Sequence, residues 1–224
     1  MDKFESILKE STARINNVVD NQLLKYKFFK DTNFKKNIES LKKVLCDDAT
    51  FMLSSPIAYF SKSNLIVVNT LAINQETITV EDFSMLYLHE LIHMASTNRD
   101  NNNIGYISSD NGYPKIYTEA ATQYLTLKLL YGDNLKEAID KNYVYPEAVK
   151  LFSKMVEEVG EEVLYNGFFE ADPNKHRKEI PFDKILEWGN LLLQMIDLDE
   201  QSYCEELDKS YEEAINKEIK KGIL

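Results

Sequence analysis

Cysteine is scarce in this sequence, which has only two among its 224 residues, Cys46 and Cys204. They lie far apart in the chain, and this spacing excludes both a disulfide framework and a metal site built from paired cysteines. Glycine and proline are scarce as well, with seven and five residues. So few of these residues leave little room for disordered linkers, and we expect one compact domain over residues 1–224.

Positively charged residues are also few compared with acidic ones. Lysine and arginine number 26 against 37 acidic residues, which gives a net charge of −11 and a pI near 4.9. Proteins bind phosphate backbones through clustered Lys and Arg, and no such stripe occurs here, so nucleic acid is not an expected partner. Neither a run of about 18 apolar residues nor a signal-peptide-like start is present. We therefore expect a soluble, cytoplasmic protein with no membrane partner.

The sequence does contain clear hydrophobic patterning, mostly with a helical period. Apolar residues three and four apart predict helices over residues 15–24 and 33–46. Residues 50–70 instead contain β-branched and aromatic runs separated by Ser-Pro and by SKSN, which is typical of a small sheet with a hairpin. Helical patterning returns after Gly132, with expected segments near residues 146–158, 161–169, 181–196 and 201–220.

This patterning predicts an α+β fold that is predominantly helical. We expect N-terminal helices in residues 1–48, the sheet and the core of the molecule in residues 49–131, and a C-terminal helical region in residues 132–224. The polar stretch 96–114 is expected to be a surface loop, with room for a short strand at IGYI.

Two of the three histidines occur in LHELIH, at His89 and His93, with Glu90 directly after the first. Thr79 and Asp82 fit a capping box, and the apolar run that follows predicts a buried helix. Residues four apart on a helix project from the same face, so both imidazoles can reach one metal ion. Glu90 lies one position round the turn, where its carboxylate can address a water on that ion.

The alternative is that His89 and His93 are ordinary packed residues. Each buried imidazole would then need its own hydrogen-bond partners, and two of a chain's three histidines within one turn of an apolar helix would be costly without a shared role. Metal binding is the favoured interpretation.

A catalytic zinc needs a third protein ligand. A metzincin continuation of the motif would need glycine at 96 and histidine at 99, but the chain has Ser96 and Arg99. Glu119 is the preferred candidate, because it is the only acid in an apolar, helix-forming segment after Pro114. Asp100 and Asp110 are alternatives, although their Asn- and Ser-rich surroundings favour solvated turns.

HELIH at 89–93, followed by Glu119 within TEAATQYLT, resembles the gluzincin group of zinc metallopeptidases, in particular its small bacterial members. The resemblance implies a zincin-like core in which His89, His93 and Glu119 bind Zn²⁺ and Glu90 is the general base. It also implies a strand beside the cleft that pairs with the substrate backbone. NLIVVN, at residues 64–69, is the candidate for that strand, with an interior strand that makes no substrate contact as the alternative.

Peptide hydrolysis also needs a donor that stabilises the oxyanion of the tetrahedral intermediate. His176, Tyr106, Tyr113 and Tyr124 are candidates, and the sequence favours none of them. We expect His176 to lie in an exposed, charged loop and Tyr124 to belong to the core.

The sequence therefore predicts a zinc-dependent metallopeptidase that acts on a peptide or protein substrate, with Glu90 as the base for a metal-activated water. One alternative is a zincin-derived module that binds zinc or a protein without catalysis, although such a site would need no base. The other is an all-helical interaction protein without metal. Substrate, cleavage preference and oligomeric state stay open.

Overall fold

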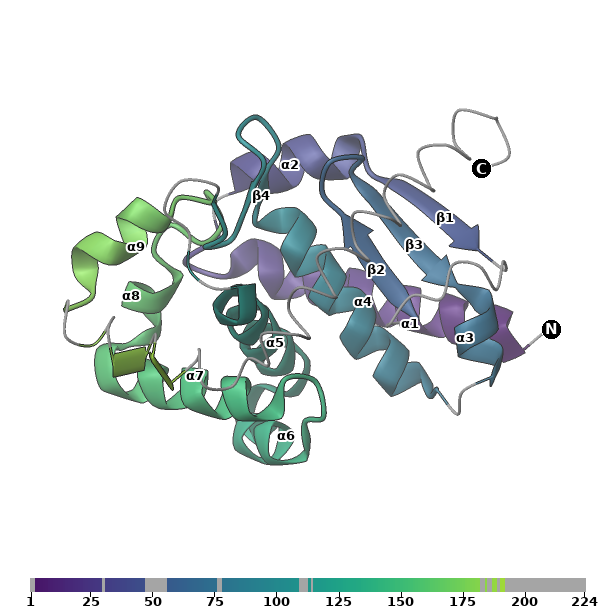
Figure 1. The fold of residues 1–224 in the computed structure, drawn as a ribbon. Coiled ribbons are helices and arrows are strands. Elements are labelled where there is room, and N and C mark those ends of the chain that lie inside the picture. Colours follow the sequence, from purple (N-terminus) through teal and green to yellow (C-terminus); the bar gives the residue numbers. More distant parts are fainter. Residues whose placement is uncertain are drawn as a thin grey trace.

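A computed structural model describes residues 3–29, 31–46, 56–75, 78–108, 113, 115–181, 184, 187, 188, 190 and 191. Most of this structure is helical, as predicted (Figure 1). The α-helices are α1 (Lys3–Asn21), α2 (Asp31–Glu39), α3 (Thr70–Gln75), α4 (Val80–Ala95), α5 (Lys115–Tyr131), α6 (Leu135–Lys141), α7 (Pro146–Val159), α8 (Glu161–Tyr165) and α9 (Pro173–Glu179). Short 3-10 helices follow α1 and α5, at Leu23–Lys25 and Gly132–Asn134.

Two small sheets complete the described structure. The larger has the order β1-β3-β2 and consists of β1 (Lys42–Cys46), β2 (Ile57–Phe60) and β3 (Leu65–Asn69). Strands β2 and β3 form an antiparallel hairpin, which confirms the hairpin predicted within residues 50–70. Strand β1 joins the other side of β3 in parallel. The second sheet pairs β4 (Thr97–Asn98) with β5 (Asn103–Ile104), so the predicted short strand at IGYI is present in part.

The predicted helix over residues 33–46 is wrong in its second half. Helix α2 ends at Glu39, and the chain continues into β1. The side-chain amide of Asn64, in the hairpin turn, donates to the carbonyl of Asn37 at 2.7 Å and to Ser40 Oγ at 2.9 Å. The Asn64 carbonyl then accepts the amide of Lys42 at 2.9 Å. Asn64 therefore stabilises the end of the helix and the start of the parallel pair, through contacts that helical periodicity does not reveal.

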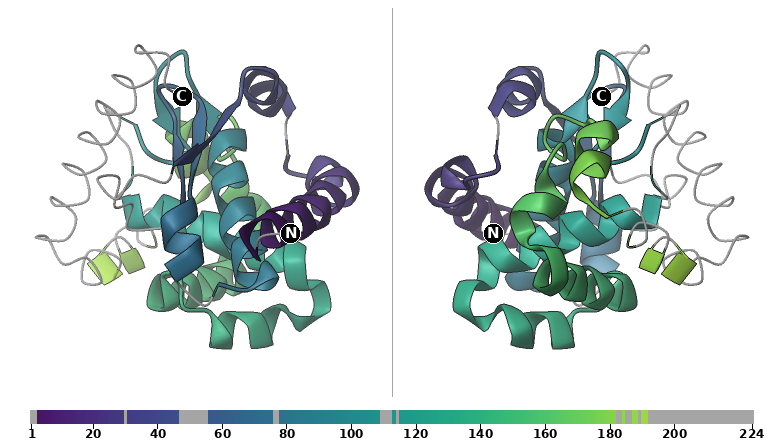
Figure 2. Two further views of the ribbon diagram at one scale, coloured as in Figure 1. Left: turned by 90° about the vertical axis from the view of Figure 1, so that its right-hand side faces the viewer. Right: turned by 90° about the vertical axis from the view of Figure 1, so that its left-hand side faces the viewer.

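Helix α4 lies at the centre of the fold. It contacts α1, α2, β2 and α5, and most of its side chains are buried. The sheet with α3 lies on one side of α4, and helices α5–α9 gather on the other (Figure 1). Helices α1 and α2 share one side of the molecule (Figure 2). The main hydrophobic core runs from Phe4 to Trp188 and joins residues of the N-terminal helices, the hairpin and the C-terminal helices.

The C-terminal helices agree with the sequence only in part. Helix α7 confirms the segment predicted near 146–158, whereas α8 ends at Tyr165, short of the predicted 169, and the chain turns before α9. Of the segment predicted at 181–196, residue 181 is not helical, whereas the other described residues, 184, 187, 188, 190 and 191, are. The segment predicted at 201–220 lies outside the described residues. Among the helices that the structure describes, none has the length and apolar character needed to cross a bilayer.

Candidate metal centre

The capping box predicted for α4 is present. Thr79 Oγ1 accepts the amide of Asp82 at 3.1 Å, and Asp82 Oδ2 accepts the amide of Thr79 at 3.1 Å. These two bonds satisfy amides that the first turn of a helix leaves unpaired, and they fix where the helix begins. His89 and His93, four residues apart, then project from the same face of the helix, towards α5.

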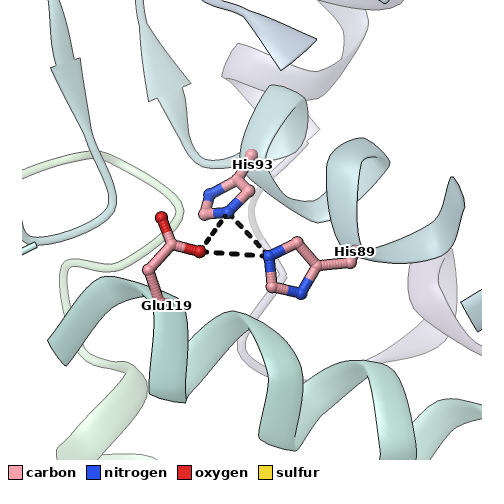
Figure 3. Close-up of side chains that lie close together, drawn as sticks. All are labelled: His89, His93 and Glu119. Atoms are coloured by element: carbon pink, nitrogen blue, oxygen red, sulfur yellow. Dashed lines mark hydrogen bonds and ion pairs between the residues drawn. The ribbon is translucent and has the colours of Figure 1, made fainter. Parts of the chain in front are cut away.

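The side chain of Glu119 reaches both histidines from α5. Its Oε2 lies 3.1 Å from His89 Nε2 and 3.1 Å from His93 Nε2, and the two nitrogens are 3.0 Å apart (Figure 3). All three side chains are buried, with exposed fractions of 5% for His89, 8% for His93 and 7% for Glu119. One ligand atom from each residue therefore faces the same small space.

This donor set can hold a metal ion. The three ligand atoms lie within 4.8 Å of one another, and within the described structure no other such group of three His, Cys, Asp or Glu residues occurs. Two imidazole nitrogens and a carboxylate oxygen are common protein ligands, at about 2.0–2.2 Å from the ion. The sequence prediction that these three residues meet is therefore correct.

The charges of the cluster are mutually stabilising. Burial alone would raise the pKa of Glu119, but the neighbouring His93 and His89 outweigh it and hold that pKa well below its ordinary value. Burial alone would lower the pKa of His89, but the hydrogen bond and charge of Glu119 outweigh it and raise that pKa. Glu119 is therefore ionised, as a metal-binding carboxylate must be.

Gln123, one turn after Glu119 on α5, orients His89. Its Nε2 donates to Asn142 Oδ1 at 2.8 Å, which leaves its Oε1 to accept from His89 Nδ1 at 2.8 Å. In the neutral ring, the form that binds a metal, a hydrogen on Nδ1 leaves Nε2 with a lone pair directed towards Glu119 and His93. Neither Gln123 nor Asn142 was among the site residues predicted from the sequence. The amide of Gln123 at helical spacing from Glu119 was a usable signal, whereas nothing in the sequence links Asn142 to the site.

Glu90 lies beside the cluster but is not part of it. Its Oε2 accepts the main-chain amide of Tyr59, on β2, at 2.8 Å. Burial raises the pKa of Glu90, and the nearby His89 and His93 reduce this rise without cancelling it. The side chain is half-buried, and its carboxylate is held against the sheet.

The other ligand candidates from the sequence do not join the cluster. Asp100 is exposed and pairs with Lys36, with Oδ2 and Nζ 2.6 Å apart. Asp110 lies outside the described residues. The expectation that His176 lies in an exposed loop is wrong, because it is fully buried on α9, where its Nε2 is 2.8 Å from the hydroxyl of Tyr117. Tertiary packing against aromatic rings outweighs the charged neighbours of His176 in the sequence.

The tyrosines considered as oxyanion donors lie in or against the core. The hydroxyl of Tyr106 donates to the carbonyl of Leu164, the ring of Tyr113 stacks on Tyr117, and Tyr124 packs against Phe152, as expected for a core residue.

Residues 64–69 do not form an edge strand beside a cleft; they match the alternative expectation of an interior strand. Strand β3 lies in the middle of the sheet, with β1 on one side and β2 on the other. Its backbone therefore bonds to a neighbouring strand on each side. Strand β2, by contrast, is in contact with α4.

Comparison of the chain with models of protein families, with curated proteins and with solved structures gives no match. A function for this chain must therefore be inferred from the geometry of the site.

Proposed function

We propose that this protein is a zinc-dependent metallopeptidase in which Glu90 is the general base. The observation that carries the proposal is the position of Glu90, whose carboxylate interacts electrostatically with His89, His93 and Glu119 but is not one of the three convergent ligands. A site that only held a metal for stability would need no such acid.

Zinc is the metal that this donor set suits best. Two histidines and a glutamate form a borderline-soft set of three ligands, which leaves a fourth tetrahedral position for water or substrate. A zinc ion held there would supply a Lewis acid that lowers the pKa of water and polarises a carbonyl group.

The burial of Glu90 suits the role of a proton carrier. A carboxyl group whose pKa is raised takes and returns a proton more readily near neutral pH. The amide of Tyr59 holds Oε2, which leaves Oε1 to accept a proton from the attacking water and then to donate it to the leaving amine.

Strand β2 supports a peptide as the substrate. Among the strands that the structure describes, it ends the three-stranded sheet on the side of α4, and the amide of Tyr59 points away from β3, towards Glu90. An edge strand beside a catalytic group can bind extended peptide backbone through main-chain hydrogen bonds, independently of the side chains.

The test compares the purified, zinc-reconstituted protein with its Glu90→Gln variant. We expect about one zinc per chain in both, because Glu90 is not a ligand. Cleavage of a fluorescence-quenched peptide library should fall by roughly 10²–10⁴-fold in Glu90→Gln, since the amide keeps the shape but cannot carry the proton. Glu81→Gln is the matched control, because Glu81 is an exposed glutamate in the first turn of the same helix.

Three results would count against the proposal. Near-zero zinc after reconstitution would remove the metal centre. Zinc loss from Glu90→Gln with unchanged cleavage would reverse the assigned roles. Bound zinc without any cleavage by the wild type would favour a non-catalytic zinc-binding module.

A further inference from the structure

Tyr145 holds an unusual backbone conformation directly before α7. Its φ of 49° and ψ of 48° lie in the left-handed region, which a residue with a Cβ atom adopts at a cost and which glycine or asparagine would adopt more easily. A disfavoured conformation at an aromatic residue persists only where the surrounding structure imposes it, and such residues cluster at functional sites.

The ring of Tyr145 lies alongside the metal centre. Its centroid is 6.4 Å from that of His89, with 28° between the two ring planes. Although it is next to a buried ligand, Tyr145 keeps 40% of its surface exposed. The left-handed backbone thus places an accessible aromatic ring beside the proposed reaction centre.

Hydrogen bonds connect the segment 142–145, which carries Tyr145, to the metal centre. Asn142 accepts from Gln123, which itself accepts from His89, and the Asn142 amide also donates to the carbonyl of Val144 at 2.5 Å. The position of the segment relative to His89 is therefore fixed by side chains of α5 and by its own backbone.

We propose that Tyr145 contacts the bound peptide and favours substrates with a large apolar side chain next to the cleaved bond. This inference rests on the proposed peptidase function. An aromatic ring offers a flat apolar surface of the kind that lines ligand sites. Tyr143, two residues earlier, is also an exposed tyrosine, but its hydroxyl bonds to Asp82 in the first turn of α4, away from His89.

The test uses Tyr145→Asn, with Tyr143→Asn as the matched control. Asparagine tolerates the left-handed conformation, so the metal-free Tyr145→Asn protein should melt at or above the Tm of the wild type. Its zinc affinity should equal that of the wild type, because Tyr145 is not a ligand. Peptide binding is measured in the zinc-loaded Glu90→Gln background, with a peptide that the wild type cleaves. There, Tyr145→Asn should raise the Kd of the peptide about tenfold. Tyr143→Asn should have a smaller effect.

The outcomes separate this inference from the function on which it rests. If the wild type cleaves no peptide, the proposed function fails. If the wild type cleaves peptides, but Tyr145→Asn in the Glu90→Gln background binds the peptide as tightly as Glu90→Gln alone, only the role of Tyr145 is overturned. A loss of zinc affinity in Tyr145→Asn would also overturn it, since the residue would then act through His89 and not through the peptide.

Discussion

Glu119 is the residue on which the candidate metal centre depends most. The two histidines share one helix and keep their spacing whatever else changes, whereas Glu119 reaches them only because α5 packs against α4. Its buried carboxylate is balanced by both imidazoles and would be costly without them or a cation.

Replacement of Glu119 by alanine should abolish tight zinc binding. Two imidazoles and solvent would then hold the ion. The zinc affinity should fall by more than about 10–100-fold, which is the loss typical of mutating a residue that only hydrogen-bonds to a ligand. Competition with a chromophoric chelator measures the change, and circular dichroism confirms that the variant is folded. Asp100→Ala is the control and should bind as the wild type does. Equal zinc affinity in Glu119→Ala would require a different third ligand.

At the scale of single residues, the sequence predicts those site residues that are recognised from neighbours in the same helix. The histidine pair follows from helical spacing, and Glu119 is conspicuous as the only acid in its helix. Asn142, Tyr145 and the buried state of His176 could not be predicted, because each depends on how separate helices pack together.

At the scale of the element, α4 joins both halves of the candidate site. It carries the two histidines and Glu90, and it contacts the sheet on one side and α5 on the other. Its starting point is set by two reciprocal hydrogen bonds between Thr79 and Asp82. These bonds lie about two to three turns before His89, so they should affect the stability of the helix more than the ligand geometry.

Thr79→Ala should lower the free energy of unfolding by about 1 kcal/mol, the usual cost of losing an N-cap side chain. Thr79→Ser keeps the capping oxygen and should retain most of the stability. Urea titration followed by circular dichroism measures both variants. Equal midpoints for the two variants would mean that the capping box contributes nothing measurable.

The sequence predicted α4 and its cap well but not the division between α2 and β1. Capping boxes and apolar runs are local signals. The strand at Lys42–Cys46 exists because it pairs with β3, and its Leu45 side chain is exposed. Pairing with a distant segment here outweighs the helical spacing of the apolar residues.

At the scale of the whole molecule, the buried His176 links stability to pH. Burial lowers its pKa to about 3, an effect that the carbonyls of Val163 and Leu164 oppose and Arg177 reinforces. An unfolded histidine has a pKa of about 6.5. Because the folded pKa is the lower one, the neutral ring's full contribution to stability is present above about pH 6.5 and is lost progressively as the pH falls towards 3.

Between pH 7 and pH 5, this histidine alone should reduce the free energy of unfolding by about 2 kcal/mol. His176→Gln removes the titrating group and keeps a polar partner for Tyr117. The difference between the two proteins in urea titrations at each pH isolates this contribution from the other groups that titrate. Parallel curves for the two proteins would show that His176 is protonated as easily when folded as when unfolded.

The order of the strands has a consequence for how the molecule assembles. Hairpins such as β2–β3, joined here by the short turn 61–64, form in about 1–10 μs, whereas a parallel pair must first close a longer loop. The local hairpin can therefore exist before β1 docks on its far side. Since the amide that holds Glu90 belongs to β2, the side of the sheet next to the candidate site can take shape during folding before β1 has joined.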